Sequence, residues 1–380
     1  MKQNERIYYL DWLRIFAFSI LILFHSWQPF NNFQWLLKSD HTTIVADVFT
    51  VFFHTWRLYL VFFVSGVGTL FALKSHGKRF FYNRFMRLIV PYLFGIIFIV
   101  PCQYYYQRLQ AGVDISFVDF MVNYPAFIAS KNLGFDPFLW IIEQGIHLWY
   151  LASLFIITMV TYPILKKINS HGISQRLMQR LTKRPKWLFL FALPIVFTIM
   201  LLKPVFPGYT SVTDFLTYSF FFVYGFAFMK QHDILLPIIQ KNNDIILIAG
   251  IVSSLLLICC LLYEPLRNAA FNPSYNQYHL VVSLLLGCSS FSWTFYFVSL
   301  FSRRFNANNR ALPGLNKCVL PVYIVHQSII VVAGFYLIRY IDSGLLEFIL
   351  ILIGAVVGSA LSYYIIKMFK ISRLLFGMKH

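Results

Sequence analysis

The feature that most constrains this chain is a series of about ten apolar stretches, each near the length of about twenty residues that a helix needs to cross a bilayer. Of the 380 residues, 59% are hydrophobic and only 12% are charged, far below the charged share of a soluble domain. The sequence therefore predicts an all-α integral membrane protein with a single transmembrane domain over 1–380. The predicted spans are 9–29, 48–73, 88–107, 146–165, 187–204, 214–230, 244–263, 279–300, 318–338 and 345–368.

The loops between these spans alternate in charge. Some carry few basic residues, such as Lys38 and Lys203, whereas the alternate loops carry clusters at 74–87 and 166–186. Because basic loops stay in the cytoplasm, this pattern predicts that the N- and C-termini are both cytoplasmic, and it accounts for most of the net charge of +18 without nucleic acid as a partner. The basic segment 168–186 either lies along the inner membrane surface or is a solvated loop.

Two titratable side chains interrupt the first apolar stretch. Arg14 and His25 are separated by about three helical turns, so they lie on one helix face with a rise of about 16 Å between them. A charged residue inside a membrane helix costs about 2.5–3.5 kcal/mol on insertion scales and is by default a functional-site hypothesis. The alternative is that Arg14 extends to the headgroups while His25 makes an ordinary interhelical hydrogen bond.

The second stretch begins with a similar pair. His54 and Arg57 are expected on one helix face, at a depth close to that of His25. A histidine beside a cation can supply a general base next to a group that stabilises negative charge, although bonds to neighbouring carbonyls would also explain the pair. Further along, Ser65 and Gly66 indicate close helix packing rather than a nucleophile.

Other polar groups lie at the predicted boundaries and in the ninth span. Arg84 and Arg87 are spaced to hold one phosphate group, although the charge rule for loops would also place arginines there. His147 is either an interfacial residue or part of a site, and His326 either lines a cavity or bonds a neighbouring helix. Cysteine and histidine spacings predict no metal site and no disulfide framework, and the first apolar run has no cleavage site, so it is expected to be retained.

Taken in order along the chain, these motifs resemble the membrane-bound acyltransferase-3 family. The likeness rests on Arg14-x10-His25, on Phe-Phe-Val-Ser-Gly at 62–66, on Arg84-x-x-Arg87 and on Tyr323-x-x-His326. The resemblance implies an O-acyltransferase that takes an acyl group, acetyl or succinyl, from cytosolic acyl-CoA. The group would be transferred to a hydroxyl of an extracytoplasmic glycan or lipid-linked sugar by a multi-pass protein of the inner (plasma) membrane, without a metal.

The resemblance also implies roles for individual residues. The catalytic group would comprise His25, Arg14, His54 and Arg57. The phosphates of acyl-CoA would be bound by Arg84, Arg87 and Arg79. The acceptor would be bound by His147, Trp149, Tyr323 and His326. Two other classes of protein remain open on the residues alone: a transporter or flippase of a glycan intermediate, and an inactive partner of an envelope-glycan synthase.

Overall fold

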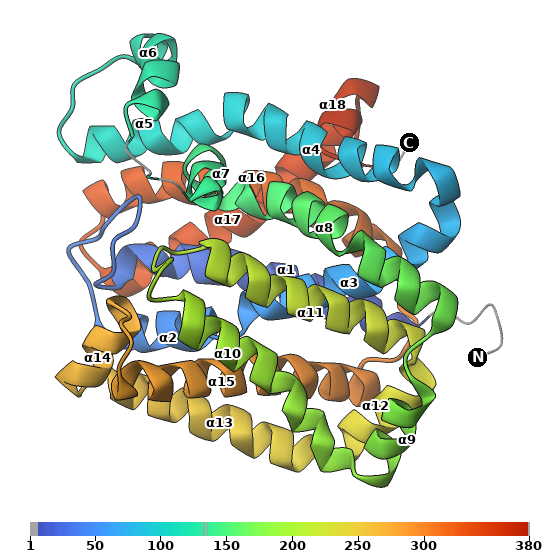
Figure 1. Ribbon diagram of the computed structural model, residues 1–380. Helices are drawn as coiled ribbons and strands as arrows, with labels where there is room; N and C mark the ends of the chain where they lie inside the picture. Colours follow the sequence, from blue (N-terminus) through green and yellow to red (C-terminus); the bar gives the residue numbers. More distant parts are fainter. Residues whose placement is uncertain (1–6, 132–133, 135, 379–380) are drawn as a thin grey trace. The chain divides into compact units, whose positions relative to one another are not determined.

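The computed structural model describes residues 7–131, 134 and 136–378, and every regular element among them is a helix (Figure 1). Within this described part, nine segments are long and apolar enough to cross a membrane. One of them, Ile44–Gln110, contains two of the ten predicted spans, and each of the other eight corresponds to one. The prediction of an all-α integral membrane protein is therefore confirmed, whereas the cytoplasmic placement of both termini stays a prediction.

By its internal contacts, the chain divides into two compact units. Unit 1 comprises the described residues up to Ala17, together with Val51–Phe80 and Ile156–Leu312. Unit 2 comprises Phe18–Thr50, Phe81–Phe155 and the described residues from Pro313 onward. The prediction of a single domain over 1–380 stays a prediction. The helices α1 (Tyr8–Trp27), α2 (Ile44–His54) and α8 (Trp149–His171) contribute several residues to each unit, whereas α4 (Phe80–Phe98) and α16 (Leu312–Tyr340) each contribute only their first residue to unit 1.

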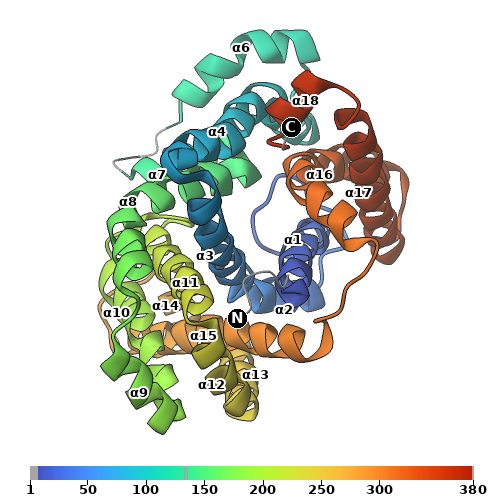
Figure 2. The ribbon, with the colours of Figure 1, turned by 90° about the vertical axis from the view of Figure 1, so that its right-hand side faces the viewer.

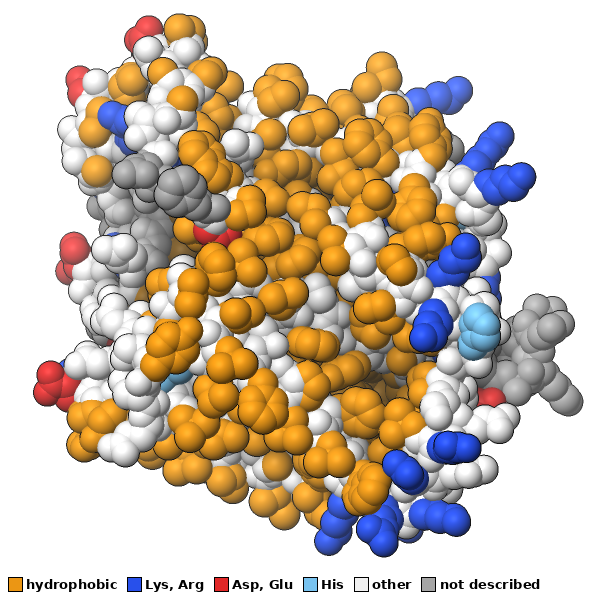
Figure 3. Space-filling view, viewed as in Figure 1, with side chains coloured by type: hydrophobic (Ala, Val, Ile, Leu, Met, Phe, Trp, Pro, Cys, Tyr) orange, Lys and Arg blue, Asp and Glu red, His pale blue; other side chains and the backbone are white. Residues whose placement is uncertain are grey.

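Unit 1 is a bundle of long apolar helices with basic residues gathered at one end. In Figure 3 hydrophobic side chains cover α10 and α13, while Lys and Arg side chains lie over α9 and α12. Its elements are α3 (Arg57–His76), η2 (Gly77–Arg79), α9 (Gln175–Lys183), η4 (Pro185–Ala192), α10 (Leu193–Leu202), α11 (Val212–Lys230), α12 (His232–Lys241), α13 (Asn243–Cys260), α14 (Glu264–Phe271) and α15 (Gln277–Arg304).

The helices α3 and α11 pack with their backbones in contact. A Cβ atom added at Gly66 would lie 1.9 Å from the Phe222 carbonyl oxygen, and one added at Gly225 would lie 1.9 Å from that of Phe63. Any larger side chain at either glycine would force the two helices apart. The close packing expected at Ser65 and Gly66 is therefore confirmed, and it follows the small-residue rule of membrane helix pairs.

Unit 2 contains the second half of α1 and the last spans of the chain. Its elements are η1 (Gln28–Phe30), α4 (Phe80–Phe98), α5 (Val100–Gln110), α6 (Phe117–Ala129), α7 (Pro137–Gly145), η3 (Ile146–Leu148), α16 (Leu312–Tyr340), α17 (Gly344–Ile366) and α18 (Lys370–Leu375). Figure 2 shows α16 and α17 side by side. Ile330 of α16 and Ile351 of α17 belong to one buried apolar cluster that includes Phe30 of η1.

Candidate active site

The strongest polar constellation in unit 2 joins two histidines from distant parts of the sequence. His25 lies in the last turn of α1 and His326 lies in the middle of α16. The Nδ1 atom of His25 is 2.9 Å from the Nε2 atom of His326, and the two rings stack with centroids 5.1 Å apart. His326 is completely buried, whereas His25 keeps part of its surface exposed. His326 therefore contacts the buried side of the His25 ring, and the rest of that ring stays partly exposed.

The hydrogen bonds of this pair fix the protons on both rings in their neutral form. The Nδ1 atom of His326 lies 2.7 Å from the Tyr323 carbonyl oxygen, which can only accept, so Nδ1 carries the proton. The Nε2 atom of His326 then has a lone pair and accepts from the Nδ1–H of His25. The lone pair of His25 is consequently on Nε2. This is the arrangement that an imidazole needs to remove a proton from a hydroxyl.

A second buried network lies next to the pair. The Nε2 atom of His147 donates to the Ile324 carbonyl at 2.9 Å, and the amide of Gln103 approaches its Nδ1 atom at 3.2 Å. The same Gln103 amide donates to Ser328 at 2.8 Å, and its oxygen accepts from Gln327 at 3.1 Å. The network therefore joins η3, α5 and α16. His147 is buried, so the interpretation of this residue as a purely interfacial one does not fit its position.

The sequence analysis missed Gln103 and Gln327. The rule that singled out the histidines applies to them as well, because an amide inside an apolar span is costly unless it bonds to another group. Gln103 is completely buried and Gln327 nearly so. A scan for every hydrogen-bonding side chain within the spans would have found both residues.

Two further residues expected at the acceptor site lie beside this network. The Tyr323 hydroxyl donates to the His147 carbonyl, and its ring meets Phe18 and Tyr150 edge-on. Trp149 is the first residue of α8 and is mostly buried. The structure thus brings His25, His147, Tyr323 and His326 together in unit 2.

The short helix η1, which directly follows α1, is held by the ammonium group of Lys38. Its Nζ atom donates to the carbonyls of Gln28 and Asn31 at 3.1 and 2.6 Å, and to the Asn31 side chain at 2.7 Å. The backbone of Lys38 also exchanges two hydrogen bonds with the side chain of Gln110, at the end of α5. Partial burial lowers the pKa of Lys38 to about 8, and the nearby Asp47 charge opposes this effect. Lys38 therefore links the segment that follows the helix of His25 to the helix of Gln103.

His54 and Arg57 lie in unit 1, and the structure corrects their expected local geometry. The predicted continuous helix over 48–73 is interrupted at Thr55 and Trp56, so His54 ends α2 and Arg57 begins α3. The break has a packing cause. Trp56 is buried among aromatic rings, and the Thr55 hydroxyl donates to the Phe52 carbonyl while accepting from Ser289. The i,i+3 relation of one helix therefore does not apply to the pair.

Tyr209 links these two residues instead. The ring of His54 lies 5.3 Å from that of Tyr209, and the buried guanidinium of Arg57 makes a hydrogen bond to the same tyrosine. Tyr209 precedes Thr210, which has a positive φ of 54°, and a Lys203–Asp214 ion pair of 2.8 Å lies in the same part of the fold. A non-glycine residue with positive φ is strained and persists only where neighbouring contacts stabilise it. Such contacts therefore fix the backbone conformation of the loop at Thr210.

The remaining predicted residues fall on well-defined helices. Arg14 and His25 both lie on α1, which is unbroken from Tyr8 to Trp27, as a shared helix face requires. Arg84 and Arg87 are one turn apart near the start of α4. Arg79 is exposed in the short helix η2 of unit 1, whereas Arg84 and Arg87 belong to unit 2. In the described ranges, no group of three or more His, Cys, Asp or Glu side chains is arranged to hold a metal ion.

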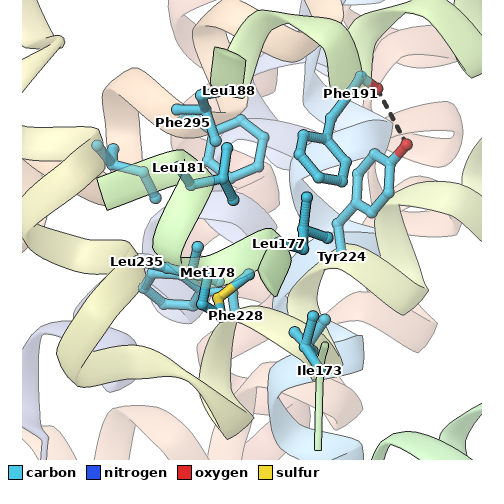
Figure 4. Close-up of a pocket in the computed structure, with 12 residues that line it drawn as sticks. Ile173, Leu177, Met178, Leu181, Leu188, Phe191, Tyr224, Phe228, Leu235 and Phe295 are labelled. Atoms are coloured by element: carbon cyan, nitrogen blue, oxygen red, sulfur yellow. Dashed lines mark hydrogen bonds between the residues drawn. The ribbon is translucent and has the colours of Figure 1, made fainter. Parts of the chain in front are cut away.

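The basic segment 168–186 contains an amphipathic helix whose apolar face is already covered. In α9, Met178 and Leu181 are buried and line an apolar cavity of about 70 Å³ (Figure 4). Residues from η4, α11, α12 and α15 complete its walls, and the Tyr224 hydroxyl donates to the Phe191 carbonyl at 2.9 Å. The buried side chains of α9 thus pack on other helices of unit 1, and the choice between a membrane-surface segment and a solvated loop stays a prediction.

Comparison with known proteins identifies the family of the chain. A family profile described as an acyltransferase domain, that of the acyltransferase-3 family, matches residues 7–364. The chain belongs to the acyltransferase-3 family. The resemblance found in its motifs is therefore confirmed, and the protein is a multi-pass membrane enzyme that transfers acyl groups other than aminoacyl groups.

Similar proteins include two that share one name. Glucans biosynthesis protein C of Escherichia coli O157:H7 (strain EC4115 / EHEC) is 22% identical over 384 residues, which cover 95% of this chain and 91% of that protein. Glucans biosynthesis protein C of Salmonella paratyphi B (strain ATCC BAA-1250 / SPB7) is 23% identical over 377 residues, covering 94% of this chain and 91% of that protein. No solved structure matches the chain.

Proposed function

We propose that this acyltransferase-3 protein moves an acetyl or succinyl group from cytosolic acyl-CoA to a hydroxyl of an extracytoplasmic glycan or lipid-linked sugar. The observation that carries the proposal is the hydrogen-bond chain from the Tyr323 carbonyl through His326 to His25. A glucan is the favoured acceptor, because the relatives from Escherichia coli and Salmonella are named for glucan biosynthesis. The inner (plasma) membrane is the expected location.

In this proposal His25 is the general base. Its Nε2 atom takes the proton of the acceptor hydroxyl while the hydroxyl oxygen attacks the thioester carbonyl carbon. The carbon–sulfur bond then breaks, and the imidazolium returns the proton to the leaving thiolate. His326 keeps the lone pair of His25 on Nε2 and so acts as a positioning residue. An alternative within the same reaction is that His25 carries the acyl group transiently.

The other predicted residues take supporting roles. We assign Arg57 and His54 to stabilising negative charge during transfer, since a buried guanidinium bonded to Tyr209 is a fixed positive group. Arg14 would bind or orient the donor, and His147, Trp149 and Tyr323 would shape the acceptor site. Arg79, Arg84 and Arg87 would bind the phosphates of CoA.

The test is a transfer assay on the full protein in nanodiscs with acetyl-CoA or succinyl-CoA and isolated periplasmic glucan. We expect release of free thiol together with a glucan mass increase equal to the acyl group supplied. His25→Gln should abolish both signals, whereas His171→Gln, an exposed histidine at the end of α8, should leave them unchanged. Glycan movement across the membrane without thiol release would instead indicate a transporter. No activity without an added synthase would indicate a partner protein.

A further inference from the structure

A chain of buried hydroxyl groups runs from α13 through α15 to the break between α2 and α3. The Trp293 indole N–H donates to the Ser254 hydroxyl at 2.8 Å, and the hydroxyls of Ser254 and Ser289 are 3.0 Å apart. Ser289 bonds to the Thr55 hydroxyl at 2.9 Å, and Thr55 bonds to the Phe52 carbonyl at 2.9 Å. All five residues belong to unit 1, and the three that carry hydroxyls are buried. The chain therefore ends on the backbone of α2.

The hydrogen bonds of this chain all run in one direction. A carbonyl oxygen can only accept, so the Thr55 hydroxyl gives its single proton to Phe52. Ser289 must then donate to Thr55, and Ser254 must donate to Ser289. Each hydroxyl thus donates once and accepts once. Hydrogen bonds linked in this way polarise one another, so the loss of one link weakens the others.

The chain supplies a donor where the end of α2 needs one. The carbonyls in the last turn of a helix have no donor within that helix. Phe52 lies in the last turn of α2, which ends at His54, and its carbonyl accepts from the Thr55 hydroxyl. The next residue, Trp56, is buried and packs against Phe297, with ring centroids 4.7 Å apart. Hydroxyl groups at one residue of the break and aromatic rings at the other therefore hold the backbone between the two helices.

The two residues assigned to charge stabilisation flank this break. His54 is the last residue of α2 and Arg57 is the first of α3, so each lies within two residues of Thr55. Both contact Tyr209, His54 through its ring and Arg57 through a hydrogen bond. A group that stabilises developing charge is most effective when it is already in place, because no reorientation is then needed during the reaction. The position of both side chains depends on the backbone that the hydroxyl chain holds.

We propose that Thr55, Ser289 and Ser254 are positioning residues for acyl transfer. They hold the break between α2 and α3, and with it His54 and Arg57, in the geometry that the reaction needs. The inference rests on the proposed role of Arg57 and His54 in stabilising negative charge. The three hydroxyls bond to one another in the protein interior and would touch neither donor nor acceptor. Their loss should therefore lower kcat and kcat/KM equally, as for an interaction that matters only in the transition state.

The first experiment compares adjacent serines on the same helices in the transfer assay. Ser289→Ala and Ser254→Ala each remove one link of the chain. The controls Ser290→Ala and Ser253→Ala each remove a buried hydroxyl that donates to a carbonyl of its own helix. We expect kcat to fall at least about fivefold in the first pair, as for the loss of one hydrogen bond, and to stay within about twofold in the controls. Equal rates in the two pairs would overturn the positioning role.

A second pair of variants separates the hydroxyl from the shape of the side chain. Thr55→Val keeps the branched shape of threonine without the hydroxyl, whereas Thr55→Ser keeps the hydroxyl. We expect Thr55→Val to lower kcat at least about fivefold and Thr55→Ser to recover most of the rate. Because the chain acts through Arg57, Thr55→Val should add little to the loss caused by Arg57→Gln. Equal rates for the Val and Ser variants, or full additivity with Arg57→Gln, would contradict the proposal.

A readout without catalysis keeps this inference separate from the proposed function. Diethyl pyrocarbonate modifies exposed imidazoles, and His54 is exposed where it lies against Tyr209. Peptide mass spectrometry should show His54 modified at least about threefold faster in Ser289→Ala than in the wild type or Ser290→Ala, because the break is loosened. The exposed His171 is the internal reference and should react equally in all three proteins.

The two readouts together assign a failure to one hypothesis or the other. If modification of His54 accelerates in Ser289→Ala while no acyl-CoA supports transfer, the hydroxyl chain does hold the break and the proposed function fails. If transfer proceeds while Ser289→Ala matches the wild type in both kcat and modification of His54, the proposed function stands and the positioning role is wrong.

Discussion

The two units place their titratable groups in different kinds of surroundings. In unit 2, His25 and His326 are joined by a hydrogen-bond chain that ends on a backbone carbonyl, with 2.9 and 2.7 Å between the bonded atoms. In unit 1, Arg57 is buried beside the hydroxyl of Tyr209, and His54 lies against the ring of the same tyrosine. The first arrangement fixes where a proton and a lone pair lie. The second fixes a positive charge whose protonation does not change.

This difference separates proton transfer from the stabilisation of negative charge, two tasks that a single histidine–arginine motif would combine. A general base must switch between neutral and charged forms, so it benefits from a partner that sets its tautomer. A group that stabilises negative charge works best when it is always charged and does not move. We therefore expect unit 2 to carry proton transfer and unit 1 to carry charge stabilisation.

The largest expected effect is at His25. His25→Gln keeps hydrogen-bonding capacity but has no basic nitrogen, so the transfer rate should fall by about 10³-fold, within the usual range for a general base. The measurement is single-turnover transfer in nanodiscs, with membrane abundance determined in parallel. CoA affinity should not change. Substantial transfer by His25→Gln would show that His25 is only a structural hydrogen bonder.

The next effect is at His326, which touches no reacting atom in this proposal. His326→Leu should lower kcat by roughly 10²-fold, because His25 would lose the contact that orients it. His326→Gln can still accept from the Nδ1–H of His25 and should recover part of the rate. The pH dependence of kcat should shift in both variants. Equal rates for the Leu and Gln variants would argue against positioning through this hydrogen bond.

A smaller effect is expected in unit 1. Arg57→Gln should lower kcat/KM by roughly tens-fold, less than the ~10²–10³-fold typical of removing one donor that stabilises negative charge, because Gln keeps a hydrogen-bond donor. His54→Ala should cost less than Arg57→Gln, because His54 is exposed at the end of α2. The comparison needs both variants at wild-type abundance in the same assay. If His54→Ala matches the loss at His25, the division of tasks between the units is wrong.

The smallest expected effect is on the pH dependence of stability, through Lys38. Its pKa of about 8 in the folded protein lies below its ordinary value of 10.5, so the unfolded chain binds more protons between these two pH values. The contribution of Lys38 to stability should therefore rise as the pH increases from about 8 to about 10.5. Melting temperatures of the wild type and Lys38→Met, measured across this range, test the sign. The melting temperature of Lys38→Met should rise less steeply with pH than that of the wild type. Identical slopes of melting temperature against pH would exclude Lys38 as the source of the pH dependence.

Much of the fold followed from composition and the positions of apolar stretches. All ten spans predicted from length and hydropathy correspond to apolar segments of the structure. The reason is that a helix pairs all of its backbone N–H and C=O groups within one segment, as the absence of water in lipid requires. The short contact motif at Ser65 and Gly66 was also predictable, since small residues let helices approach closely. The break at Thr55 and Trp56 was not, because it depends on Ser289 and on aromatic rings far away in the sequence.

By itself, the sequence determined the membrane architecture, the family and the identity of the individual histidines and arginines that interrupt apolar helices, because the cost of a polar group in lipid can be judged from local sequence. Only the tertiary structure decided which of these groups meet. The bond between His25 and His326, the amide of Gln103 beside His147, and the docking of the turn after α18 against α4 join residues tens to hundreds of positions apart. Such contacts depend on how whole helices pack, and no local pattern of residues encodes that packing.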